Sequence, residues 1–147
     1  DSDGSDKSIG ADYSPMDGLM VFAAASDQAG SATTTDKANS FGFTYTSMGA
    51  TVGMQMTSVD DATADADTDR THISASFAVN ENLSVSYGMS TVEFESAAKT
   101  DQEDSGFGVS YTMGSMSLTA AANSSDNVGG TSGTDDTHKE MSVAFAF

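Results

Sequence analysis

The feature that most limits how this chain can fold is a two-residue alternation of apolar and small side chains. Near the end of the chain, Met141, Val143 and Phe145 alternate with Ser142 and Ala144. A period of two places successive residues on opposite faces of a β-strand, whereas a helix repeats every 3.6 residues. The chain is therefore predicted to be all-β.

The alternation recurs in nine segments, which turn-forming residues separate. The predicted strands are 8–14, 19–27, 40–47, 50–59, 71–80, 83–96, 106–113, 116–123 and 137–147. Their connections alternate between tight turns, at 14–18, 47–50, 80–82 and 113–116, and long polar segments, at 28–39, 60–69, 97–105 and 124–136. An antiparallel sheet with short turns at one end and long loops at the other is expected.

The two faces of each predicted strand differ in chemistry. Ile73 and Phe77 share one face, whereas Ser74 and Ser76 share the other. Soluble sheets usually present many charged residues to solvent, but here the polar face is made of Ser, Thr, Gly and Ala, and charge lies in the long loops. The pattern fits a transmembrane antiparallel β-barrel, with apolar residues toward lipid and small polar residues around a wet interior.

Composition excludes several other classes of function. The chain has 22 acidic and five basic residues, so it lacks the clustered Lys and Arg that nucleic-acid binding needs. Without cysteine it can form neither disulfides nor thiolate metal sites. No enzyme motif is present: His72 and His138 fit no zinc spacing and are expected at strand rims. The chain is therefore not expected to be an enzyme.

Two stretches resemble a known family, the Gram-negative outer-membrane general porins of alphaproteobacterial type. "SIGADYSPMDGLMVFAAASD" (8–27) looks like a porin hairpin, and "HKEMSVAFAF" (138–147) is similar to the terminal porin strand with its final Phe147. The resemblance implies a sixteen-stranded, homotrimeric barrel in the outer membrane, with a water-filled channel for passive diffusion of small hydrophilic solutes and ions. It implies no cofactor.

A sixteen-stranded barrel needs about twice this length, so residues 1–147 are interpreted as one barrel segment, the C-terminal half, with an N-terminal half as partner. Two alternatives remain open. If residues 8–14 are a tail, the other eight strands form a small closed barrel that serves as an anchor or adhesion protein without a pore. A soluble, acidic, calcium-binding β-protein would instead bury its Phe and Met side chains.

Parity predicts which residues line the pore. The expected lining residues are Asp12, Ser74, Ser76, Ser84, Ser86, Ser110, Thr112, Glu140 and Ser142. Almost no basic residue has a lumen-facing place, and Lys139 shares parity with the lipid face. Because Asp12 and Glu140 add negative potential, a mild preference for cations is expected.

The acidic loop "VDDATADADTDR" (59–70) offers the hard oxygen ligands that calcium prefers. The candidate ligands are Asp60, Asp61, Asp65, Asp67 and Asp69. A solvated, self-repelling loop explains the same residues without any ion. A further hypothesis is that divalent ions bridge such loops to anionic lipopolysaccharide. At the other end, Tyr13, Tyr45, Tyr111 and Phe147 lie near the short turns or the C-terminus, where an aromatic girdle is expected.

Overall fold

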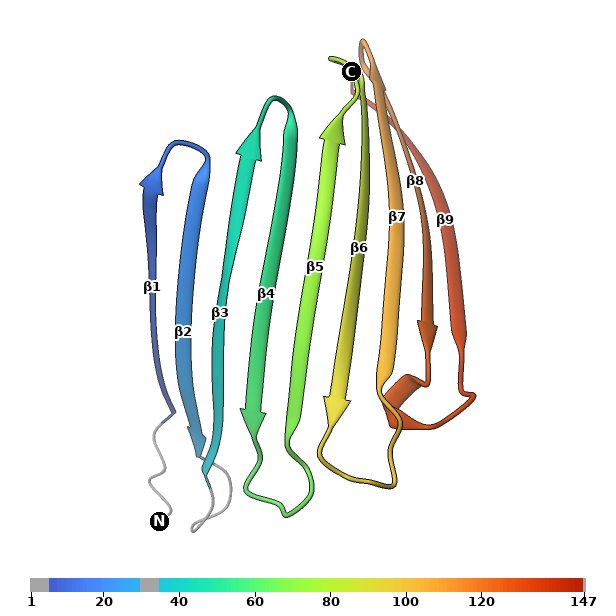
Figure 1. Ribbon diagram of the computed structural model, residues 1–147. Coiled ribbons are helices and arrows are strands. Elements are labelled where there is room, and N and C mark those ends of the chain that lie inside the picture. The colour runs from blue at the N-terminus through green and yellow to red at the C-terminus, as the bar shows by residue number, and fades with distance from the viewer. Residues whose placement is uncertain (1–5, 30–34, 147) are drawn as a thin grey trace.

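The chain forms one antiparallel sheet of nine strands in sequence order (Figure 1). The computed structural model describes residues 6–29 and 35–146. The strands are β1 (Lys7–Met16), β2 (Leu19–Ala29), β3 (Thr35–Ser47), β4 (Ala50–Asp60), β5 (Thr68–Ala78), β6 (Leu83–Phe94), β7 (Gln102–Met113), β8 (Met116–Asp126) and β9 (Asp136–Phe145), and a 3-10 turn η1 (Val128–Gly130) follows β8. In this part of the chain no helix has the length and apolar character of a membrane span.

All nine predicted strands are confirmed, but most are longer than expected. The expected long segments 28–39, 60–69, 97–105 and 124–136 all contribute residues to strands. At these ends both faces of the sheet are polar, so the hydrophobic contrast disappears although the backbone ladder continues. Residue 147, the predicted end of the last strand, lies outside the described residues.

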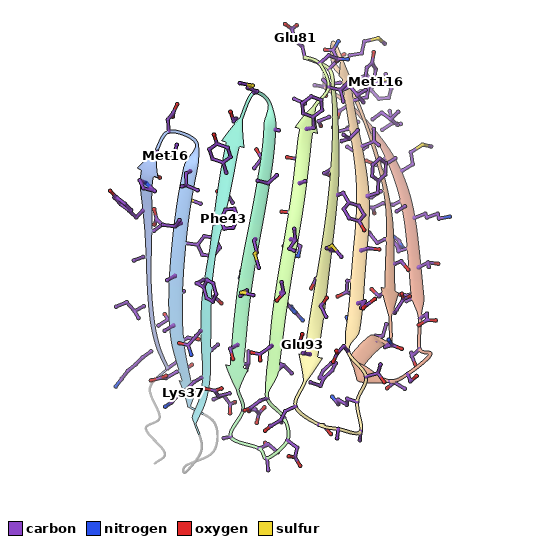
Figure 2. All side chains as sticks on the ribbon, viewed as in Figure 1. Met16, Lys37, Phe43, Glu81, Glu93 and Met116 are labelled. Carbon is purple, nitrogen blue, oxygen red and sulfur yellow. The ribbon has the colours of Figure 1, made fainter. Side chains whose placement is uncertain are left out.

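The predicted difference between the two ends of the sheet is confirmed. The turns after β1, β3, β5 and β7 lie at one end, and the longer connections lie at the other (Figure 1). Figure 2 shows Met16, Glu81 and Met116 toward the short-turn end, and Lys37 and Glu93 toward the long-loop end. We call these the short-turn end and the long-loop end.

Local sequence explains the short turns. Only two residues, Met48 and Gly49, connect β3 to β4, and both have positive φ, at 51° and 79°. Positive φ at both central positions is the type I′ geometry, which matches the right-handed twist of the flanking strands. The turn therefore fixes the register in which Ser47 pairs with Ala50.

The sheet is open in the described residues. β1 pairs with β2 and β9 with β8, and these two edge strands stand at opposite sides of the sheet (Figure 1). The eight-stranded alternative treats residues 8–14 as a tail and needs closure between β2 and β9. Neither feature is present, because residues 8–13 pair with β2 and the other edge of β2 pairs with β3.

Candidate functional site

The register places every predicted pore-lining residue on the same face of the sheet, which we call the polar face. Ser74 pairs with Gly88, and Gly88 pairs with Gly106, so consecutive strands present matched positions to one side. The residues so placed are Asp12, Ser74, Ser76, Ser84, Ser86, Ser110, Thr112, Glu140 and Ser142. Their contact with a pore stays a prediction.

Hydroxyl groups on the polar face bond across neighbouring strands. Ser40 Oγ lies 2.9 Å from Thr57 Oγ1, and Thr119 Oγ1 lies 2.8 Å from Ser142 Oγ. Such cross-strand pairs stabilise the sheet by roughly 0.2–1 kcal/mol each. Each hydroxyl keeps further donor or acceptor capacity for water, so this face combines a fixed scaffold with a hydrated surface.

The polar face bears mostly negative charge. Its carboxylates in the described strands are Asp12, Asp36, Asp104, Asp136 and Glu140. The expectation that almost no basic residue shares this face needs one correction, Arg70. β5 begins at Thr68, before the predicted start at 71, and the register pairs Arg70 with Thr57 and Val92 on the polar face.

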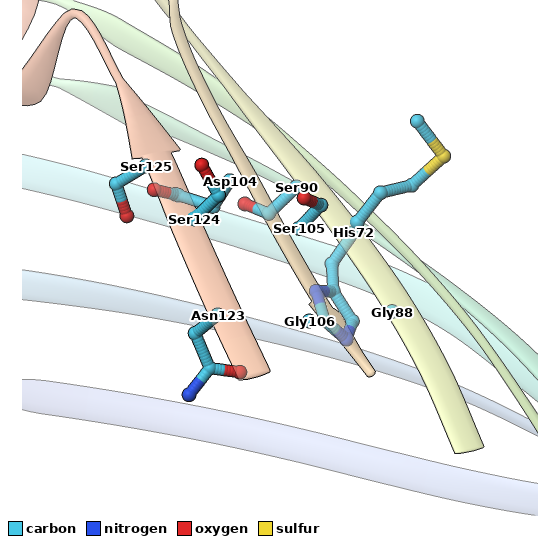
Figure 3. Close-up of a pocket in the computed structure, with 10 residues that line it drawn as sticks. His72, Gly88, Ser90, Asp104, Ser105, Gly106, Asn123, Ser124 and Ser125 are labelled. Atoms are coloured by element: carbon cyan, nitrogen blue, oxygen red, sulfur yellow. The ribbon is translucent and has the colours of Figure 1, made fainter. Parts of the chain in front are cut away.

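Both histidines lie on the polar face. His138 is near the start of β9, but the expected rim position of His72 is wrong, because β5 begins at Thr68 and His72 lies inside it. His72 is exposed in β5, and His138 Nε2 in β9 lies 3.6 Å from Glu140 Oε2. Figure 3 shows His72 beside Gly88 and Gly106, at a shallow hollow of about 250 Å³. Gly106 leaves room for the Asn123 side chain at the edge of this hollow, because a Cβ at Gly106 would meet Asn123 Oδ1 at 2.6 Å. Hydrogen-bonding side chains from β5, β7 and β8 line this hollow.

The opposite, apolar face is open to its surroundings. Ile73 is 45% exposed, Phe77 47%, Phe107 48% and Phe145 58%. Tyr45 and Tyr87 share this face, since the register pairs Tyr45 with Val52 and Tyr87 with Phe107. A soluble protein rarely leaves so large an apolar surface uncovered.

The five predicted calcium ligands are not arranged as a metal-binding group in the part of the chain that the structure describes. No group of three His, Cys, Asp or Glu side chains in the described residues has a metal-binding arrangement. Two of the carboxylates bond the loop backbone instead: Asp67 Oδ1 accepts the Asp61 N–H at 2.8 Å, and Asp61 Oδ1 accepts the Thr63 N–H at 2.7 Å. The Thr63 backbone and hydroxyl lower the pKa of Asp61 below its ordinary value. Calcium binding stays a prediction, which calorimetric titration tests.

Sequence reasoning missed the acidic neighbours that β6 brings to this loop. A hollow of about 320 Å³ at the long-loop end is lined by carboxylates from β4, β5, β6 and the residues that border β5 and β6. These are Asp60, Asp67, Asp69, Glu93 and Glu95. The strand register reveals that these acidic groups are neighbours, because Asp69 pairs with Glu93 across β5 and β6.

Comparison with solved structures gives the architecture a precedent. A variant of the Rhodobacter blastica porin matches 98% of this chain with a TM-score of 0.69 and 17% identity, over 46% of that porin chain. A second variant of the same porin matches 95% of this chain with a TM-score of 0.66, at 17% identity and over 45% of its own length. The chain has a porin-like fold.

The same architecture extends beyond that porin. OmpT, an outer membrane protein of Vibrio cholerae, matches 92% of this chain with a TM-score of 0.55 and 18% identity. This match covers 51% of the OmpT chain, so the porin-like sheet spans about half the length of each of these structures. No protein-family model and no curated protein matches the chain.

Proposed function

We propose that this porin-like sheet is part of the wall of a water-filled channel in the outer membrane of a Gram-negative bacterium. Small hydrophilic solutes and ions diffuse passively along the polar face, and no chemical step occurs. One observation supports this proposal above all: hydroxyls and carboxylates predominate on one face, and exposed aromatic and aliphatic side chains predominate on the other.

Burial argues against the soluble alternative. A soluble sandwich would cover Phe77, Val109 and Phe145 with a second layer. Phe77 and Phe145 are instead about half exposed, and Val92 is the one hydrophobic residue that counts as buried in the described part of the chain. The hydrophobic surface is therefore available to lipid.

A continuous apolar band along the strands is a further feature shared with transmembrane barrels. On β6 the apolar face continues from Leu83 through Val85 and Tyr87 to Met89, and Thr91 and Glu93 follow. Six residue steps of about 3.3 Å give a run of roughly 20 Å along the strand, and a tilt of about 35–45° reduces its height to roughly 15 Å. Transmembrane barrels carry an apolar band of roughly 25 Å.

Strand direction limits how the barrel is completed. β1 and β9 both run from the long-loop end to the short-turn end, because eight antiparallel steps separate them. The two edge strands are therefore parallel to each other. A barrel in which every neighbouring pair is antiparallel needs an odd number of additional strands between them. We propose that these strands belong to an N-terminal half of the barrel, and that the complete barrel assembles as a homotrimer.

Charge on the polar face supports a mild preference for cations. Asp12, Asp104 and Glu140 outweigh the single strand cation Arg70 on this face of the described sheet. Lining charges set ion selectivity in a pore of this kind. Reversal potentials in a salt gradient test this preference, and a preference for anions would contradict it.

Planar-bilayer conductance of the full chain as it is made in the cell tests the channel itself. Purified protein is expected to add discrete, ohmic conductance steps, and sizing in detergent is expected to show trimers. A protein that inserts without conductance would contradict the proposal and favour an anchor protein. Recovery in the soluble fraction without detergent would contradict membrane insertion altogether.

A further inference from the structure

An unexpectedly buried residue, Val92, lies on the polar face at the long-loop end. Val92 is only 5% exposed although the register pairs it with Arg70 and Gln102 on the wet side of the sheet. Two residues further along β6, Phe94 is on the same face, opposite Thr68. Since open strands alone would leave these side chains in water, something at this end covers them.

The two connections that flank β7, residues 95–101 and 127–134, meet at this end of the sheet, and Lys99 and Gly130 lie against Phe94. Thr100 donates its N–H to the Gly130 carbonyl at 3.1 Å, and Asn127 Nδ2 donates to the Asp101 carbonyl at 3.1 Å. These bonds join segments that lie about thirty residues apart in the sequence. We call the joined pair the loop shelf.

Side chains of the sheet hold the shelf on the polar side. Gln102 Oε1 accepts the Gly129 N–H at 2.9 Å, while Gln102 Nε2 donates to Asp104 Oδ1 at 2.9 Å. Lys99 Nζ lies 4.3 Å from the centre of the Phe94 ring, a cation–π contact. Figure 1 shows η1 beside the long-loop end of β7.

Gly130 sits at the centre of the shelf. It is buried at φ 79°, and a Cβ there would lie 2.8 Å from Lys99 Cδ and 3.0 Å from Phe94 Cε2. Only glycine, among the residue types, adopts this left-handed backbone and allows this close approach at low energetic cost. The shelf is thus a packed element with a specific fit.

We propose that the loop shelf is a fixed, inward-folded ledge that narrows the outer entrance of the channel and sets the size of solute admitted. This inference rests on the proposed channel function, because it assigns the polar face to the lumen. The cation–π contact of Lys99 with Phe94 and the hydrogen bond from Gly129 to Gln102 hold the ledge against that face, so it reduces the cross-section before solutes reach the hydroxyl-lined strands.

Conductance of a matched glycine pair tests the entrance role. Gly130→Leu is expected to displace the shelf, raise single-channel conductance and admit larger uncharged sugars in liposome swelling. Gly133→Leu is the control: Gly133 also has positive φ, at 73°, but a Cβ added there would have no atom within 4 Å. Equal conductance and equal solute cut-off in the parent and Gly130→Leu would overturn the entrance role.

Thiol labelling tests the shelf without depending on transport, because the chain has no cysteine of its own. In the folded full chain, Val92→Cys is expected to react with a water-soluble maleimide much more slowly than Ser86→Cys, an exposed position on the same face of β6. Adding Gly130→Leu is expected to remove this protection. Equal rates in the two single variants would overturn the shelf. If the parent protein conducts no ions, the proposed function and the entrance role both fail, and the labelling still reports the shelf.

Discussion

Consecutive residues of β5 face opposite environments although they share one backbone. Ile73 and Phe77 project from the apolar face and are 45% and 47% exposed, while Ser74 and Ser76 project from the polar face. In a soluble sheet the apolar side would be the covered one. The comparison teaches that this sheet is stabilised by its backbone ladder and its surroundings, with little dry core of its own.

The sharpest way to break this comparison is to place the same charge on each face. Ile73→Arg is expected to destabilise the protein by about 2–4 kcal/mol, because it puts a cation into hydrocarbon. Ser74→Arg is its matched control and is expected to cost much less, since its guanidinium reaches water. Urea unfolding in lipid vesicles measures both. Equal losses would mean that the two faces meet the same medium.

A second test examines packing on the polar face. Gly42 lies under the Phe22 ring, and a Cβ at Gly42 would meet the ring Cζ at 2.6 Å and also strike the Met54 carbonyl oxygen. Gly42→Ala is expected to lower the free energy of unfolding by roughly 1–3 kcal/mol through overpacking. At Gly53 the nearest atoms are at 3.4 Å, so Gly53→Ala serves as the control and should cost less. A Gly42→Ala variant as stable as Gly53→Ala would contradict this packing.

The hydroxyl pairs sharpen the comparison at smaller magnitude. Removing the Thr119–Ser142 bond through Thr119→Val and Ser142→Ala is expected to show a coupling of about 0.5 kcal/mol, at the low end for hydrogen bonds because both groups reach water. A double-mutant cycle in unfolding experiments isolates this coupling. A value above roughly 1.5 kcal/mol would indicate a dry, buried pair.

The smallest expected effect is on ion selectivity. Arg70→Gln is expected to increase the preference for cations slightly, because it removes a positive charge from the polar face. Glu93→Gln changes charge at a nearby position on the opposite face and is expected to leave reversal potentials unchanged. A larger shift from Glu93→Gln than from Arg70→Gln would reverse the assignment of faces.

Much of the fold could be predicted because alternation is a local signal. The faces of Ile73 and Ser74 follow from parity, and every predicted lining residue falls on one face once the register is known. Strand ends are less predictable. Alternation alone leaves Arg70 outside its strand because Thr68, Asp69 and Arg70 give no hydrophobic contrast, although their backbone continues the ladder.

The loop shelf was beyond sequence reasoning for a physical reason. Its contacts join Phe94 and Lys99 to Gly130, and Gln102 to Gly129, across separations that no local pattern encodes. In the sequence, Val92 and Phe94 are apolar residues at polar-face positions of β6, but the alternation does not indicate what covers them. Only the three-dimensional arrangement at this end of the sheet makes Val92 the buried residue.

Depth-dependent fluorescence quenching along β5 tests the central claim most directly. Single cysteines at residues 73 to 77 each carry a fluorophore in the full chain, reconstituted in vesicles; residues 1–147 contribute no cysteine of their own. Brominated lipid chains are expected to quench positions 73, 75 and 77, and iodide in water is expected to quench 74 and 76. Alternation of this kind supports lipid on the apolar face and water on the polar face. Quenching of all five positions by iodide alone, or with the opposite parity, would contradict it.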